Sequence, residues 1–365
     1  MSDNDPPSYL LGFALFWAMI MCGSAGVVFS ALTNNLHVPP ALCTSWRLIW
    51  VEILQIIPFT ATVRRLQEEY EERTIVKHWI TEGTALIQEG KTDTADEEEG
   101  LDNPTLLSRF VTSIPLLMLS GVCLGVHFTS WVYSLRMTSL THSLLWVSMG
   151  PILINGGCWI VYLVRLTKVR PSLMETFGTL VGLSGALIML LDVGKGTKSG
   201  AGYHPPTLSG DMTALLGAAT VSVYLVIGRH LRAWMPLWIY TFAVIGVAYS
   251  TSLLLSFLLG ENPSVSMVFG FVQHPYLPYA LYLGAGPGLG GHVMLNFLVK
   301  FVSPLTIATA MLSEPLLGSV IGFFAGMQGI PQVYTWLGGV VLLIGLYLIL
   351  RGEQQRSELS QDNAT

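Results

Sequence analysis

The sequence has little charge for its length. Only 11% of its 365 residues are Asp, Glu, Lys or Arg, and 52% are hydrophobic, whereas a soluble globular protein carries about 25% charged residues. Most of the charge lies in a few short stretches, and the long segments between them carry almost none. This distribution argues against a soluble enzyme or binding domain and indicates a polytopic membrane protein.

Several chemical signatures are also missing. The net charge is -5 and no basic block occurs, which argues against a nucleic-acid partner. The four cysteines lie singly in apolar stretches and form no CxxC pair, so they predict no metal site. The sequence contains no nucleophile elbow, Walker loop or HExxH motif. We therefore expect no cofactor, no metal and no catalytic residues.

Long apolar runs, in contrast, are abundant. A membrane helix needs about 20 predominantly apolar residues, and ten runs approach or exceed that length. We expect spans near 10–32, 41–60, 111–135, 138–163, 173–192, 209–228, 236–259, 276–299, 304–326 and 331–350. Each is about twice as long as a barrel strand. The predicted fold class is therefore an all-α membrane protein with ten transmembrane helices.

Lys and Arg are unequally divided between the two sides of these spans. If the N-terminus is cytoplasmic, fourteen of them lie on the inner side and only Arg136, Lys195 and Lys198 on the outer side. The positive-inside rule then places both termini in the cytoplasm, in a plasma membrane or an internal membrane. The long connection 61–110 becomes a cytoplasmic insertion. Its segment 64–89 is expected to form a helix on the membrane surface, and we favour a solvated insertion over a docking segment.

The second half of the sequence repeats spacings of the first. Fifteen residues separate Arg136 from Pro151, and also Lys300 from Pro315. Spacings of seven and seven recur in two further sets, which are Pro171, Gly178 and Gly185, and Pro331, Gly338 and Gly345. Such fixed spacings indicate an internal duplication.

Each repeat would contain five spans, an odd number, so the second copy enters the membrane in the opposite sense. Inverted repeats allow a central site to be exposed alternately to the two sides, which is how secondary transporters work. The predicted domains are a first repeat over 1–192, which includes the insertion 61–110, a second repeat over 193–352 and a cytoplasmic tail over 353–365.

Four stretches of sequence resemble a known group. Segment 210–219, GDMTALLGAA, resembles the start of the second EamA-type half in the drug/metabolite transporter superfamily. Segments 300–304 (KFVSP) and 312–318 (LSEPLLG) are similar to its eighth-to-ninth helix region, and Trp46-Arg47-Leu48 resembles its early arginine. The resemblance covers nearly all of the chain except 61–110 and the last dozen residues.

The resemblance implies ten helices with both termini inside. It also implies a central cavity lined by helices one to four and six to nine, with the fifth and tenth helices peripheral. The sequence departs from the family pattern at Arg165 and Gln328, where an acidic residue is frequent, and at Gly150, which stands where the second half has Glu314. The superfamily implies amino acids, amines, nucleobases, sugars or sugar-phosphates as solutes, so the substrate stays open.

Three charged residues fall within the expected spans and away from their ends. Glu314 lies about ten residues into the ninth span, where a carboxylate costs at least about 2.5 kcal/mol unless it is paired or protonated. We interpret it either as a proton- or cation-binding group that faces a cavity, or as a neutral acid bonded to a carbonyl freed by Pro315. Arg47 either binds an anion or extends to the outer interface. Glu52 is deeper and pairs either loosely with Arg47 or with a residue from another helix.

Two histidines lie at related places in the two halves. His127 and His292 are each about 17 residues into spans that run in opposite directions, which predicts positions toward opposite sides of the membrane. They are candidates for gate or proton-relay groups, and the alternative is ordinary packing. The remaining candidates for substrate binding or coupling are side chains with a polar tip: Trp131, Trp146, Tyr224 and Asn296. For the aromatic candidates the alternatives are packing or an interfacial belt.

Taken together, these features predict a secondary transporter that moves a small organic solute by alternating access, with proton coupling left open. Its partners are the small-molecule substrate and the lipid bilayer, and assembly as a homodimer is also left open. Two alternatives belong to other classes. One is a membrane scaffold or regulator that transports nothing, and the other is an intramembrane enzyme built from His127, His142, His292 and Glu314.

Overall fold

The computed structural model describes residues 6–88, 106–138, 140–167, 170–193, 207–324 and 330–362. All regular structure within these ranges is helical, as expected where no water satisfies the backbone. The first half contains α1 (Ser8–Ser30), η1 (Ala31–Asn35), α2 (Pro40–Gln88), α3 (Leu106–Ser134), α4 (Leu140–Val147), α5 (Gly150–Leu163) and α6 (Leu173–Val193). The second half contains α7 (Leu208–Arg232), α8 (Leu237–Leu258), α9 (Val265–Val268), η2 (Phe269–Val272), α10 (Leu277–Leu283), η3 (Gly284–Val293), α11 (Met294–Leu298), α12 (Pro304–Met311), α13 (Glu314–Phe324) and α14 (Val333–Asp362).

Nine helical stretches in the described ranges are long and apolar enough to cross a membrane. The segment expected at 276–299 is not among them, because it is divided into α10, η3 and α11, which follow one another without a gap. Its middle, η3, consists of π-helical turns and contains Pro287. Five glycines in η3 weaken a regular α-helix, and proline removes a backbone donor. The presence of ten spans therefore stays a prediction.

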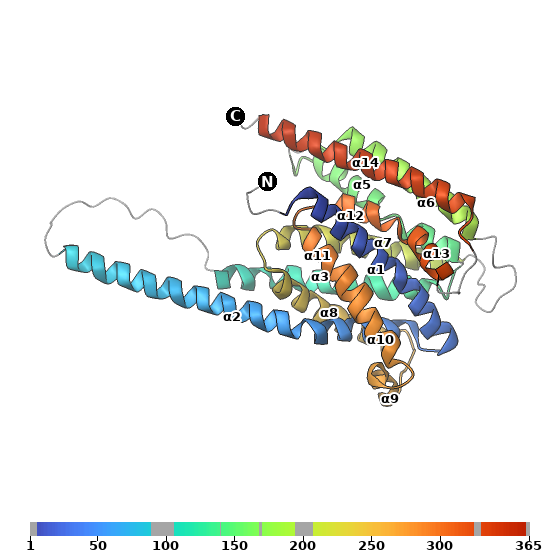
Figure 1. The fold of residues 1–365 in the computed structure, drawn as a ribbon, viewed down its shortest axis with the longest axis horizontal. Coiled ribbons are helices and arrows are strands. Elements are labelled where there is room, and N and C mark those ends of the chain that lie inside the picture. Colours follow the sequence, from blue (N-terminus) through green and yellow to red (C-terminus); the bar gives the residue numbers. More distant parts are fainter. Residues whose placement is uncertain are drawn as a thin grey trace.

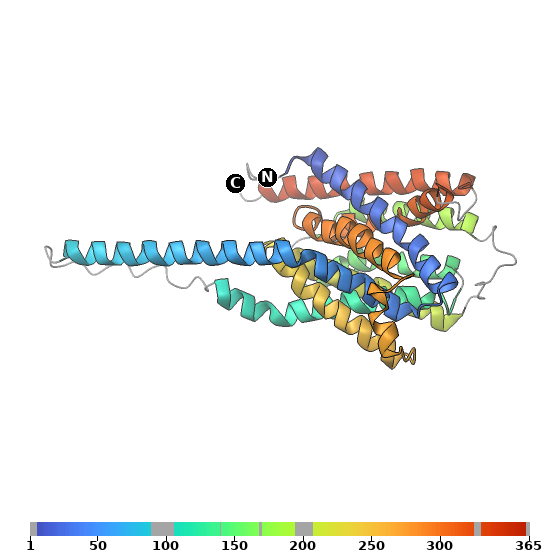
Figure 2. The same cartoon turned by 60° about the horizontal axis from the view of Figure 1, so that its bottom comes forward.

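Helix α2 is longer than expected. The sequence predicted a span that ends at 60 and a separate surface helix over 64–89, but one continuous helix runs from Pro40 to Gln88. It projects far beyond the bundle, at the end where α1 begins and α14 finishes (Figures 1 and 2). The prediction of a surface helix was wrong because charged residues such as Arg65 and Glu69, which form an i,i+4 ion pair at 3.5 Å, favour a helix outside the membrane as well.

The glycines of the repeated spacing lie between α6 and α14. A Cβ atom on Gly178 would be 2.8 Å from the carbonyl oxygen of Gly345, and one on Gly185 would be 2.6 Å from that of Gly338. These distances leave no room for a side chain, so the helices touch backbone to backbone. The first glycine of each set meets the second glycine of the other set. The two helices are therefore antiparallel, and the contact is reciprocal.

Other contacts between helices are reciprocal in the same sense. Helix α3 packs against α7 and α8, and η3 packs against α1 and α2. Helices α4 and α5 contact α7, whereas α12 and α13 contact α1. When the expected spans are numbered one to five in each half, α1 corresponds to α7, α2 to α8 and α3 to the segment that contains η3. In the same way α4 corresponds to α12 and α5 to α13, so each of these contacts has its counterpart in the other half.

Glycines mark one reciprocal pair of contacts. A Cβ atom on Gly125 of α3 would lie 2.7 Å from the carbonyl oxygen of Ala248 in α8. In the other half, a Cβ atom on Gly284 would lie 2.4 Å from Cβ of Trp50 in α2. Both glycines allow a close approach of helices that a larger residue would prevent.

Two expected spans are interrupted at equivalent places. Helix α4 ends at Val147 and α5 begins at Gly150, while α12 ends at Met311 and α13 begins at Glu314. In both cases a proline occupies the second position of the new helix, where its missing N–H costs little. Glu314 therefore lies in the first turn of a helix, where the helix dipole favours a carboxylate, and within the candidate span Pro304–Phe324, as expected.

Candidate functional site

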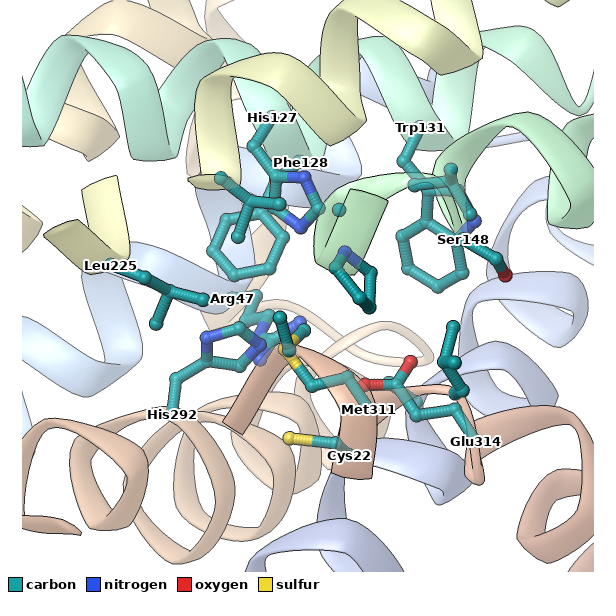
Figure 3. Close-up of a pocket in the computed structure, with 17 residues that line it drawn as sticks. Cys22, Arg47, His127, Phe128, Trp131, Ser148, Leu225, His292, Met311 and Glu314 are labelled. Carbon is teal, nitrogen blue, oxygen red and sulfur yellow. The ribbon is translucent and has the colours of Figure 1, made fainter. Parts of the chain in front are cut away.

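A cavity of about 70 Å³ lies at the centre of the described helices. Its walls come from α1, α2, α3, α7, η3 and the two helix breaks, whereas α6 and α14 contribute none of the described lining residues. One water molecule needs about 10–15 Å³ on this scale, so the cavity has room for a few waters. The candidate residues that line it are Arg47, His127, Trp131, His292 and Glu314 (Figure 3).

Arg47 is fixed deep inside the protein, and its side chain is 1% exposed. Its Nη2 donates a hydrogen bond of 2.9 Å to the carbonyl oxygen of Pro287 in η3, and its guanidinium lies 4.5 Å from the ring centre of Phe128. Its Nε has no hydrogen-bond partner among the described residues. The interpretation that Arg47 extends to the outer interface was therefore wrong, because η3 and α3 cover its helix at this depth.

Glu314 lies on another wall of the same cavity and is half-buried. Its carboxyl group points into the space that Arg47 also lines (Figure 3). Within the described part of the chain the two side chains form no direct ion pair. The cavity therefore contains a cation and an anion on separate walls.

His127 and His292 lie together, not toward opposite sides of the membrane. Their ring centres are 5.1 Å and 4.7 Å from that of Phe128. The Nδ1 of His127 is 2.9 Å from the carbonyl oxygen of Gly217 in α7, and because a carbonyl only accepts, this nitrogen carries the proton. The Nδ1 of His292 has no partner among the described residues. The predicted separation of the two histidines was wrong. The number of residues from the start of an apolar run does not give the depth of a side chain in the membrane when the helix extends beyond that run.

A hydrogen-bonded chain continues from the cavity toward α7. The hydroxyl of Tyr224 donates to Oδ1 of Asn296 at 2.7 Å, and Nδ2 of Asn296 donates to the carbonyl oxygen of His292 at 2.8 Å. Asn296 lines a smaller cavity of about 10 Å³, which also touches Arg47 and Phe128. Tyr224 and Asn296 thus support the wall that carries His292, but neither lines the central cavity.

The other candidates divide between the cavity and its surroundings. Trp131 lines the cavity, and its Nε1 has no partner among the described atoms. Trp146 does not line it. Glu52 faces α8: its carboxylate accepts a hydrogen bond from Gln55 and lies against Gly246. The separation of five residues already places Glu52 and Arg47 on different faces of their helix, but the sequence could not show which neighbour each face meets.

The sequence analysis missed Phe128, whose ring lies against Arg47 and both histidines. An apolar residue in an apolar span carries no signal of its own, and only its position next to His127 could have indicated it. The side chain of His142 lies outside the described part of the structure. Within that part, no three His, Cys, Asp or Glu residues gather as metal ligands.

Comparisons with known proteins agree with a membrane protein of this kind. No family model matches the sequence. A protein of Archaeoglobus fulgidus described as an uncharacterized transporter is 24% identical over 245 residues, which is 66% of this chain and 77% of that protein. One crystal structure matches with a TM-score of 0.63 over 94% of this chain and 98% of the other, at 17% identity, and it supports the fold alone. The chain is an integral, multi-pass, all-α membrane protein.

Proposed function

We propose that this protein is a secondary transporter of a small organic solute and that it works by alternating access. It would be built as two inverted five-helix repeats of the EamA type, with both termini in the cytoplasm. The observation that carries the proposal is the central cavity, which has a buried Arg47 and a separate Glu314 on its walls. Buried charge inside a membrane bundle is costly and is retained mainly along solute or ion pathways.

The arrangement around the cavity supports this proposal. The cavity lies at two helix breaks, between α4 and α5 and between α12 and α13. Discontinuous helices at the meeting place of two repeats are typical of solute sites in secondary transporters. The reciprocal contacts between the halves and the transporter relative support the same conclusion.

The helices on either side of the two breaks, α4 with α5 and α12 with α13, also provide a gate. Helices α5 and α12 pack against each other, whereas α4 and α13 make no comparable contact in the described ranges. We assign the α5–α12 contact as the closed gate of this state. A two-fold exchange of conformations between the halves would open it and bring α4 toward α13, which would expose the cavity to the other side.

Transport of metabolites by the purified full-length protein would test this proposal. Proteoliposomes with and without the protein are incubated with a metabolite mixture, and the solutes inside are measured by mass spectrometry. We expect at least one solute to enter only the protein-containing vesicles and to exchange with unlabelled solute. A pH gradient across the same vesicles separates proton-coupled transport from facilitated diffusion.

The two alternative functions give different results in the same system. An intramembrane enzyme would convert a metabolite in detergent without any gradient, and a scaffold or regulator would neither convert nor move one. Failure of every solute in a broad metabolite extract to enter or exchange, with correctly folded protein, would contradict the transporter proposal.

A further inference from the structure

We propose that the solute is a small zwitterion, with a carboxylate that binds Arg47 and a primary ammonium group that binds Glu314. This inference rests on the proposed transport function and names the class of solute that the cavity accepts. It follows from hydrogen-bond groups that the cavity walls leave without partners and from the balance of charge between the walls.

One wall of the cavity is suited to an oxyanion. Arg47 and His292 are both nine-tenths or more buried, and both contact the same ring of Phe128. Within the described structure, Nε of Arg47 and Nδ1 of His292 have no hydrogen-bond partner. Unsatisfied buried polar atoms in native proteins are uncommon, and a guanidinium is suited to binding a carboxylate. The guanidinium of Arg47 therefore has a donor without an acceptor, which a solute can supply.

The wall that carries Glu314 instead lacks, among the described residues, a hydrogen-bond donor for its carboxylate. A carboxylate in the first turn of α13 offers acceptors and, when ionised, no donor. Within the described residues it forms no ion pair with Arg47, although both side chains line one cavity. A solute that bridges the two walls must therefore donate to Glu314 and accept from Arg47.

The charge balance distinguishes a zwitterion from a simple ion. With Arg47 and Glu314 both ionised, the cavity is neutral before the solute enters. A carboxylate alone or an amine alone would leave a net charge inside a low-dielectric bundle, which is costly unless a proton or another ion accompanies it. A zwitterion keeps the cavity neutral and pairs both protein charges.

The rest of the lining is apolar and includes Val221, Leu225, Ala308 and Met311. These side chains suit a small hydrocarbon body between or beside the two charged groups. The cavity of about 70 Å³ is small, so the smallest zwitterions fit with the least rearrangement of the helix breaks.

Binding to the full-length protein in lipid nanodiscs tests the proposal with three matched sets of ligands. The sets are alanine with propionate and ethylamine, leucine with 4-methylpentanoate and 3-methylbutylamine, and phenylalanine with 3-phenylpropionate and 2-phenylethylamine. Each set contains a zwitterion and the two analogues that lack one of its charged groups. We expect at least one zwitterion to bind about tenfold or more tightly than both of its analogues, because each analogue leaves a protein charge unpaired.

Substitution of Glu314 adds an internal check. In Glu314→Gln we expect the preference for the zwitterion over the carboxylic acid to fall by about tenfold, since the ammonium loses its ion pair, while the preference over the amine persists. Glu52→Gln is the matched control, because it makes the same chemical change in another span residue whose side chain faces α8 and not the cavity. This substitution should leave both preferences unchanged. Circular dichroism and the melting temperature establish that both variants are folded.

Two results would overturn the inference. One is that no zwitterion in the three sets binds more tightly than both of its analogues. The other is that Glu314→Gln and Glu52→Gln change the preferences equally. Neither result affects the transport proposal: a carboxylic acid or an amine that binds and enters proteoliposomes would leave transport intact and replace the solute class. Zwitterion binding without movement of any solute would instead contradict transport.

Discussion

Arg47 shows how far a single buried side chain constrains the site. It makes one hydrogen bond to Pro287 and one ring contact with Phe128, and these contacts hold it without a carboxylate partner in the described structure. Guanidinium geometry matters here, because Nη2 donates to the protein backbone while Nε has no partner among the described residues. A lysine would carry the same charge but lacks the planar fork of donors with which arginine binds a carboxylate.

We therefore predict that Arg47→Lys folds but binds carboxylate-bearing ligands about tenfold more weakly, which corresponds to about 1.4 kcal/mol. Titration of the purified variant with the ligand that binds the parent protein best would measure the change. Amines that lack a carboxylate should bind the variant and the parent protein equally. Equal weakening for amines and carboxylates would indicate a general distortion of the cavity.

At this scale the sequence indicated the charged residues of the site but not its shape. Arg47 and Glu314 could be selected because charge stands out in an apolar run. Phe128 could not, because an aromatic residue in an apolar run is ordinary, and Glu52 was selected although it faces a different helix. The sequence gives the chemistry of a side chain, whereas its surroundings depend on neighbours that are far away in the chain.

Among the helices, the pairing of α6 with α14 shows most clearly how the two halves of the chain contact each other. The pairing depends on glycines, since a Cβ atom at Gly185 would lie 2.5 Å from the backbone nitrogen of Leu342. The glycine spacing was visible in the sequence as evidence of duplication. That the two sets contact each other was not, because spacing within a helix does not name the helix it meets.

We predict that Gly185→Ala lowers the melting temperature of the purified protein, with a loss of about 1–3 kcal/mol, because backbone cannot move aside as a flexible side chain can. Gly156→Ala is the control: it lies within α5, and no atom approaches its added methyl group within 4 Å, so replacement of glycine in a helix should be neutral or stabilising. A smaller effect at Gly185 than at Gly156 would contradict the backbone contact.

The α5–α12 gate leads to a second prediction for the elements. A Cβ atom on Gly150 would lie 4.0 Å from Cβ of Ala308, a separation compatible with a disulfide. In a background without the native cysteines, the double variant Gly150→Cys, Ala308→Cys should crosslink on oxidation and lose transport, and a reductant should restore it. Because both positions line the cavity, the two single variants are the controls: each should transport equally well before and after oxidation. Full transport by the crosslinked protein would show that this contact does not open.

For the whole molecule, the reciprocal contacts relate the two halves of the chain. The described contacts of α3, α4 and α5 with α7 and α8 have counterparts in the contacts of η3, α12 and α13 with α1 and α2. The exception is the α5–α12 contact, which α4 and α13 do not match in the described ranges. An arrangement related by a two-fold axis in the membrane plane would produce this pattern. It requires the loop after α8 and the extension of α2 to lie on opposite sides of the membrane.

Cysteine labelling in intact cells would measure this orientation. In a cysteine-free background, we predict that Val265→Cys reacts with an impermeant maleimide from outside, because its side chain is 77% exposed. Arg65→Cys, on the extension of α2, should react only after the membrane is permeabilised. Labelling of position 65 but not 265 from outside would reverse the assigned orientation.

The sequence predicted the helices better than their ends. The expected spans at 209–228 and 236–259 correspond to α7 over Leu208–Arg232 and α8 over Leu237–Leu258, because a hydrocarbon layer requires an apolar run of fixed length. Hydropathy could not predict that α2 continues to Gln88. The hydropathy of a segment indicates where the apolar, lipid-facing residues end, and it does not indicate where the backbone hydrogen bonds of a helix end. The breaks before Gly150 and Glu314 were hidden for the same reason.

The length of α2 gives the molecule a mechanical property. Its 49 residues form a rod of about 74 Å, more than twice the thickness of the hydrocarbon layer, which is about 30 Å. Arg47 sits near one end of this rod, and the other end is free of the bundle (Figure 2). If the rod pivots near Arg47, a tilt of about 10° moves the far end by about 10 Å. A spin label or fluorophore on the projecting end of α2 would then report such a tilt without touching the cavity.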